Sequence, residues 1–87
     1  MADKPIRISG HARFEMKRRR IDKAQVEAAI RAPGQIVASR KGRDIYQILI
    51  GAAKRLLLRV VVKEEPSVYH VVTAYKTSRI AKYWKTS

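Results

Sequence analysis

A histidine near the start of the 87-residue chain is the side chain best suited to acid–base chemistry. His11 would lie in the first turn of a helix, one turn before Glu15, where the positive helix end and neighbouring cations disfavour imidazolium. A neutral imidazole in a cationic setting suits a general base, which contributes about 10²–10⁴-fold to a rate. The alternative is that His11 only begins the helix and bonds to the backbone.

An arginine and a hydroxyl pair on expected strands could bind a phosphate. Arg59 interrupts the apolar run Leu56–Val62, and it must reach water, an acid or a ligand because an unpaired buried charge is costly. The structural alternative is an ion pair with one of three nearby carboxylates: Asp44, Glu64 or Glu65. Thr73 and Tyr75 share one strand face, so they either present hydroxyls to a phosphate or simply pack.

Metal chemistry is not expected. The second histidine, His70, follows Tyr69 in an expected strand and is interpreted as a packing or edge residue. Neither histidine has the spacing of a metal motif, and the chain has no cysteine. We therefore predict no metal site and no cofactor.

Positive charge dominates the composition, with 20 Lys and Arg against 7 Asp and Glu and a formal net charge of +13. The cations gather in Lys17–Arg20 and in the C-terminal segment, where they alternate with Tyr83 and Trp84. Some of the first cluster could serve only to complement a helix dipole. Cations interleaved with aromatic rings, however, suit a phosphate backbone with exposed bases. The residues predicted to bind nucleic acid are Lys17, Arg18, Arg20, Arg43, Lys76, Arg79 and Lys82.

Two helices are expected first along the chain. Ser9 can cap a helix that runs to about Arg20. Asp22 and Gln25 have the spacing of a capping box for a second helix, which Pro33-Gly34 ends.

The pattern after Gly34 changes to strands. Runs rich in Val, Ile, Leu and Tyr are separated by short gaps, which favour hairpins; they are Ile36–Ser39, Ile45–Ile50, Leu56–Lys63 and Val68–Lys76. The segment from Thr77 to Lys85 can form a short terminal helix. The prediction is one α+β domain over residues 1–87, with two N-terminal helices followed by a four-stranded antiparallel sheet.

Composition also limits the cellular setting. Hydrophobic residues make up 46 %, which suffices for a core. The longest apolar run, Ile48 to Ala53, is far shorter than the ~20 residues of a membrane span. The lack of cysteine excludes disulfides and fits a reducing cytoplasm.

The order of several short motifs resembles a small, mostly uncharacterised bacterial domain family over about residues 9 to 76. The motifs are His11-Ala12 with Met16, Arg19 and Ile21; Val26, Ala29-Ile30 and Pro33; Gly42-Arg43 with Tyr46; Arg59–Val62 with Glu64-Glu65; and Val72–Tyr75. That family is similar to the RelE/BrnT group of toxins. Arg20 stands where the family often has glycine, so we expect the turn before the second helix to differ.

The resemblance implies a toxin of a toxin–antitoxin system that cleaves RNA without a metal and is restrained by an antitoxin. In this hypothesis His11 takes the proton from a ribose 2′-hydroxyl, while Arg19 and Arg59 stabilise the transition state. Thr73 and Tyr75 would position the scissile group, with Tyr75 as a candidate acid. The alternative is a non-catalytic basic module that binds RNA, DNA or the ribosome. The sequence is also compatible with a homo-oligomer.

Overall fold

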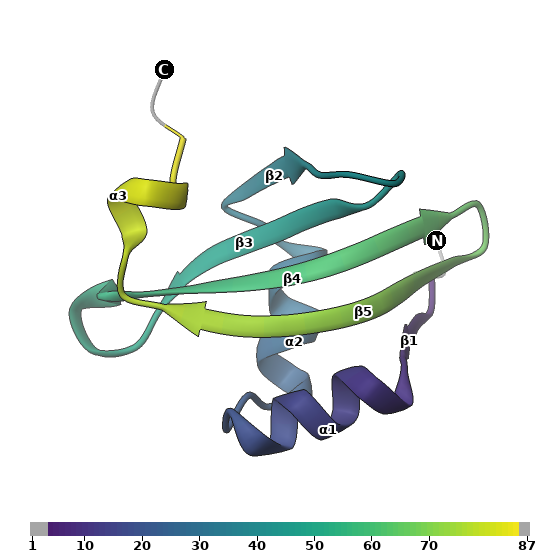
Figure 1. Cartoon of the computed structure of the whole chain (residues 1–87), viewed down its shortest axis with the longest axis horizontal. Helices are drawn as coiled ribbons and strands as arrows, with labels where there is room; N and C mark the ends of the chain where they lie inside the picture. The colour runs from purple at the N-terminus through teal and green to yellow at the C-terminus, as the bar shows by residue number, and fades with distance from the viewer. Residues whose placement is uncertain (1–3, 86–87) are drawn as a thin grey trace.

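The computed structural model describes residues 4–85 and is built around one five-stranded sheet with two helices on one face and a short helix on the other (Figure 1). In chain order the elements are β1 (Ile6–Ile8), α1 (Gly10–Arg18), α2 (Lys23–Arg31), β2 (Gln35–Ala38), β3 (Asp44–Ile50), the 3₁₀ turn η1 (Ala52–Lys54), β4 (Leu56–Glu65), β5 (Val68–Thr77) and α3 (Ile80–Tyr83). The short helix expected at the end of the chain is therefore present as α3.

The sheet has the strand order β1-β5-β4-β3-β2 and is mixed. Strands β2 to β5 form an antiparallel meander, whereas β1 pairs in parallel with residues 69–71 of β5. The prediction of a four-stranded antiparallel sheet following two helices is wrong, because it missed β1. This strand has only three residues, too few to show a periodicity, and its partner lies some sixty residues further along the chain.

Local capping signals place both N-terminal helices. The Ser9 hydroxyl accepts from the Ala12 N–H at 3.0 Å, and in the capping box of α2 the Gln25 side chain accepts from the Asp22 N–H at 3.0 Å. Both predicted helix starts are thus confirmed. Helix α1 ends at Arg18, and Arg20 then adopts φ 56°, the left-handed conformation that glycine favours. Within the described residues, no helix has the length and apolarity needed to cross a membrane.

The hydrophobic core lies between the sheet and the helices α1 and α2. Alternation along β4 directs Leu58, Val60 and Val62 toward the helices, where they share one core cluster with Ala12 of α1 and Val26 of α2. The intervening residues of β4 point to the opposite side of the sheet, which we call the open face. α3 lies over one end of this face (Figure 1).

Candidate functional site

Arg59 lies in the middle of the open face. It occupies the centre of β4, and its neighbours Leu58 and Val60 face the core on the other side of the sheet. Arg59 is only 6 % exposed, so its guanidinium has lost most of its hydration. Such a charge needs compensating contacts.

Three strands align the partners of Arg59. The pairing register places Gln47 of β3 and Tyr75 of β5 directly beside Arg59 on either side. Arg59 Nε donates to Gln47 Oε1 at 2.9 Å, and Nη1 donates to the Tyr75 hydroxyl at 2.5 Å. The ring of Tyr83, from α3, lies 4.0 Å from the guanidinium carbon and adds a cation–π contact.

All of these partners are neutral. Within residues 4–85 Arg59 forms no ion pair, although three carboxylates were the expected alternative. Glu64 instead pairs with Lys4 at 2.6 Å, and Glu65 with His70 at 2.5 Å. The hydrogen bond from Lys4 holds the pKa of Glu64 below its ordinary value. The positive charge of Arg59 is therefore solvated by dipoles and aromatic rings but not neutralised.

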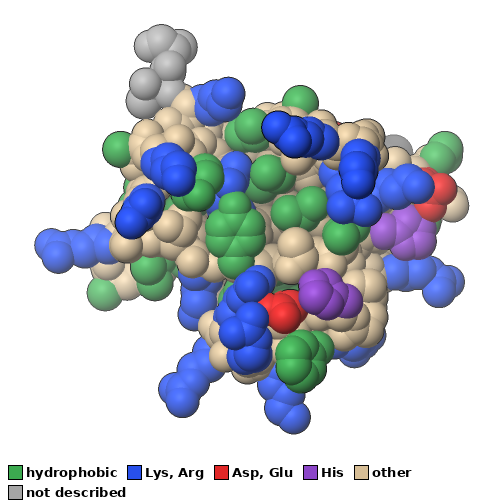
Figure 2. Space-filling view, viewed as in Figure 1, with side chains coloured by type: hydrophobic (Ala, Val, Ile, Leu, Met, Phe, Trp, Pro, Cys, Tyr) green, Lys and Arg blue, Asp and Glu red, His purple; other side chains and the backbone are tan. Residues whose placement is uncertain are grey.

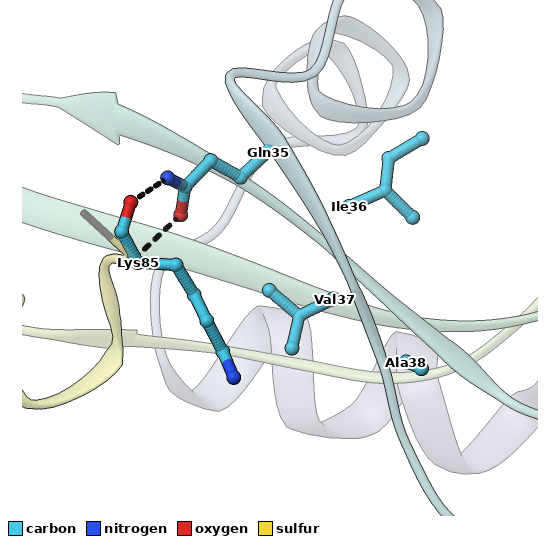
Figure 3. Close-up of a pocket in the computed structure, with 5 residues that line it drawn as sticks. All are labelled: Gln35, Ile36, Val37, Ala38 and Lys85. Carbon is cyan, nitrogen blue, oxygen red and sulfur yellow. Dashed lines mark hydrogen bonds between the residues drawn. The ribbon is translucent and has the colours of Figure 1, made fainter. Parts of the chain in front are cut away.

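The C-terminal segment 80–85 covers this site, and we call it the tail. Gln47 Nε2 donates to the Tyr83 carbonyl at 3.2 Å and to Gln35 Oε1 at 2.8 Å. The Gln35 amide in turn binds both the N–H and the carbonyl of Lys85, as Figure 3 shows. A hollow of about 390 Å³ remains beside this contact, between β2 and Lys85. Two glutamines thus hold the tail against the sheet.

Sequence reasoning missed Gln35, Gln47 and Tyr83 as parts of this site. Glutamine is uncharged, so the sequence around Gln35 or Gln47 alone did not indicate a functional site. Counting residues back from the β3–β4 turn would have paired Gln47 with Arg59, because that pairing is regular over seven positions.

The structure brings together three of the five residues predicted to be catalytic. Thr73 lies on β5 two residues before Tyr75, so both share the open face with Arg59. His11 and Arg19 belong to the α1 region, which packs on the opposite side of the sheet. No hydrogen bond within the described part of the chain joins either of them to the open-face residues.

The contacts of α1 give Arg19 a structural role. Arg19 Nη1 donates to the Ala74 carbonyl at 2.8 Å and so joins α1 to β5. Its Nη2 also pairs with Glu15 at 2.9 Å, as does Arg18 at 2.5 Å. The hydrogen bond from Arg18 is the main cause that lowers the pKa of Glu15 below its ordinary value. His11 lies exposed one turn earlier and adds a smaller contribution in the same direction.

The residues predicted to bind nucleic acid occupy three places. Lys17, Arg18 and Arg20 lie at the end of α1, and Lys76 reaches them by donating to the Arg20 carbonyl at 3.3 Å. Arg79 and Lys82 are exposed at α3, whereas Arg43 precedes β3 at the far end of the sheet. Figure 2 shows Lys and Arg side chains spread over the visible face, with few acidic groups between them.

The histidines and carboxylates of residues 4–85 do not form a metal site. No three His, Asp or Glu side chains there converge as metal ligands would. The two histidines are held apart, His11 on α1 and His70 on β5.

Taken together, the fold and site define a small basic α+β domain with a sheltered arginine on the open face of a mixed sheet. A family model described as a domain of unknown function (DUF4258) matches residues 8–76. The chain belongs to this family, which confirms the expected membership of a small uncharacterised domain family. No curated protein and no solved structure matches the chain. The similarity to RelE/BrnT toxins stays a prediction.

Proposed function

We propose that the protein binds RNA through a backbone phosphate at Arg59 and cleaves it as a metal-independent endoribonuclease of the toxin type. The observation that supports this is the guanidinium of Arg59, which is 6 % exposed and has no carboxylate partner among residues 4–85. A phosphate would supply the missing negative charge, and the planar fork of a guanidinium matches its oxygens.

The neighbours of Arg59 suit the chemistry of RNA cleavage. In that reaction the ribose 2′-oxygen attacks the adjacent phosphorus, the bond from phosphorus to the 5′-oxygen breaks, and a cyclic phosphate remains. Arg59 would stabilise the extra negative charge on the five-coordinate phosphorus. The Tyr75 hydroxyl accepts from Arg59 and so keeps its own proton available for the departing 5′-oxygen.

The base that removes the 2′-proton is assigned to His11, and this assignment places a demand on the substrate. His11 lies on the helix side of the sheet, and α1 packs beside β5. Because the 2′-hydroxyl and the phosphorus that it attacks belong to one phosphodiester linkage, that linkage would have to lie at the β5 edge, with its phosphate on the open face and its 2′-hydroxyl toward α1. In the toxin hypothesis an antitoxin is the protein partner, and the cytoplasm is the compartment where both meet RNA.

The placement of His11 favours a second candidate function. A basic module that binds RNA, DNA or the ribosome without cleaving it needs Arg59 and the surface cations, but no base beside them. In such a module Tyr75 only orients the Arg59 guanidinium.

Cleavage of a short RNA by the purified protein in EDTA tests the first function. We expect Tyr75→Phe and His11→Ala to abolish cleavage while leaving RNA affinity within about threefold, because neither change removes a cation. Intact RNA after incubation with the wild-type protein, or full cleavage by His11→Ala, would contradict the assignment. Intact but bound RNA would support the non-catalytic module.

Phosphate binding at Arg59 needs a separate measurement with a matched control. Arg59→Gln and Arg55→Gln each remove one positive charge, but Arg55 is exposed just before β4 and belongs to no site. We expect Arg59→Gln to lose RNA affinity at least tenfold and to lower the slope of log K against log salt by about 0.7, the value for one contact to single-stranded nucleic acid. Equal effects of the two substitutions would contradict a specific site. Far-ultraviolet circular dichroism confirms that both variants fold.

A further inference from the structure

A groove on the helix side of the sheet is separate from the Arg59 site. It consists of two adjoining hollows of about 400 and 530 Å³. The first follows Ile6–Ser9, along β1, and the second runs between α1 and the start of α2. The two hollows form one continuous surface, because both are lined by Ile8, Arg13 and Lys23. We call this surface the helix-side groove.

The rim of the groove is strongly cationic. Five exposed cations line it, against a single acid, Asp22; they are Arg7, Arg13, Lys17, Arg20 and Lys23. Among the described residues only Lys23 of these five forms an ion pair, with Glu27 at a loose 3.9 Å. The rim thus carries positive charge that the carboxylates of residues 4–85 leave mostly uncompensated.

The floor of the groove is apolar. Met16 and Ile21 are each 5 % exposed, and Ile8 is half-buried beside them. A phosphate backbone has no aliphatic group to place on such a floor, and among the described residues no Phe, Tyr or Trp side chain on which a base could stack lines the two hollows. An acidic peptide with one or two apolar side chains matches both parts, because its carboxylates reach the rim while its apolar groups contact the floor.

We propose that the helix-side groove is the docking site for an acidic, apolar-anchored segment of a partner protein. The inference does not depend on RNA cleavage, since neither Arg59 nor its partners Gln47 and Tyr75 line the groove. It also leaves the open face, on which Arg59 lies, free on the other side of the sheet. Partner binding and RNA binding can therefore be measured separately.

The probe is a peptide of about fourteen residues in which Leu recurs at helical spacing among Glu residues. Its counterpart with every Glu replaced by Gln keeps the apolar groups and loses the charge. We expect nuclear magnetic resonance shifts of the full, ¹⁵N-labelled chain to cluster at Ile6–Ser9 and Arg13–Lys23 with the acidic peptide alone. Shifts centred on Arg59 would overturn the proposal, as would equal binding of the two peptides.

Paired charge reversals provide the variant test. Arg13→Glu with Lys23→Glu changes both residues shared by the two hollows, and Arg40→Glu with Arg55→Glu changes two exposed arginines elsewhere. Each pair lowers the formal net charge by four, from +13 to +9. We expect the groove pair to weaken the acidic peptide at least tenfold and the control pair by less than about threefold. Equal weakening would show only non-specific attraction and overturn the proposal.

A short RNA serves as the competing ligand. We expect both double variants to weaken RNA binding to a similar extent, and Arg59→Gln to leave peptide binding unchanged. If the groove pair instead weakened RNA tenfold more than the control pair and left the peptide unaffected, the groove would be an RNA site and the proposal would fail. If Arg59→Gln binds RNA as tightly as the wild type, the proposed phosphate site at Arg59 fails, but the proposal for the helix-side groove is not affected.

Discussion

Substitution of Gly34 should release the tail from the open face. A Cβ atom at Gly34 would lie 2.8 Å from the Trp84 ring and 3.2 Å from the Gln47 carbonyl oxygen. The Trp84 ring can move, whereas the carbonyl belongs to the backbone of β3. The Gly34→Ala variant therefore relieves the clash most cheaply by displacing Trp84, and with it the tail.

The tail is held weakly enough for this clash to matter. No residue of α3 is buried, and the attachment consists mainly of the Gln35 and Gln47 hydrogen bonds and the stacking of Tyr83 on Arg59. Each hydrogen bond contributes about 0.5–1.5 kcal/mol net. Overpacking costs about 1–3 kcal/mol. A cost near 2 kcal/mol would raise the population of the displaced tail about thirtyfold, since 1.4 kcal/mol is tenfold.

The fluorescence of Trp84, the only tryptophan, reports this change directly. We expect Gly34→Ala to shift its emission to longer wavelength and to increase quenching by acrylamide. The matched control is Gly10→Ala, because a Cβ there meets nothing within 4 Å. An unchanged Trp84 emission in Gly34→Ala, with a loss of global stability instead, would refute the reasoning, since the strand and not the tail would then have moved.

Three further predictions concern stability and ionisation. Leu58→Ala should lower the free energy of unfolding by about 2–5 kcal/mol because Leu58 is fully buried, whereas Phe14→Ala, at a side chain 65 % exposed, should cost far less; urea denaturation compares them. Burial, and then Glu64, raise the pKa of Tyr46 to about 12, so Tyr46 should ionise late in a tyrosine absorbance titration. The stability that its neutral phenol contributes should be lost as pH rises from 10 toward 12. Tyr46→Phe should abolish the late step of the titration, and ionisation of Tyr46 near pH 10 would contradict the structure. Because the pKa of Glu15 is lowered, the contribution of its carboxylate to folding stability is complete above pH 4.5, the ordinary pKa, and is lost as the pH falls below 4.5. The melting temperature of Glu15→Gln should therefore fall less on acidification than that of the wild type.

Features that depend on neighbouring residues could be read from the sequence. The Ser9 cap and the Asp22–Gln25 capping box can be recognised from three or four neighbouring residues, and both are confirmed. Arg59 was also recognisable, because a charge inside an apolar run conflicts with its surroundings.

Features that depend on distant pairing could not be read in this way. The expected alternative for Arg59 was a carboxylate, but register places Gln47 and Tyr75 beside it, and the tail then brings Tyr83. For the same reason we grouped His11 with Arg59 by their chemistry alone, although α1, which carries His11, lies on the side of the sheet opposite to the Arg59 side chain. β1 escaped notice because its pairing partner comes so late in the chain.

The parallel pairing of β1 with β5 also sets an order of events during synthesis. β1 is made first, but its hydrogen-bonding partners at residues 69–71 are made last among the strands. Until then α1 lacks the strand against which it packs, which is β5, whereas α2 can already contact β3 and β4. The apolar face of α1 therefore has no cover until β5 has been made, and the like charges of Lys17 and Arg18 on the same helix oppose the association of such chains.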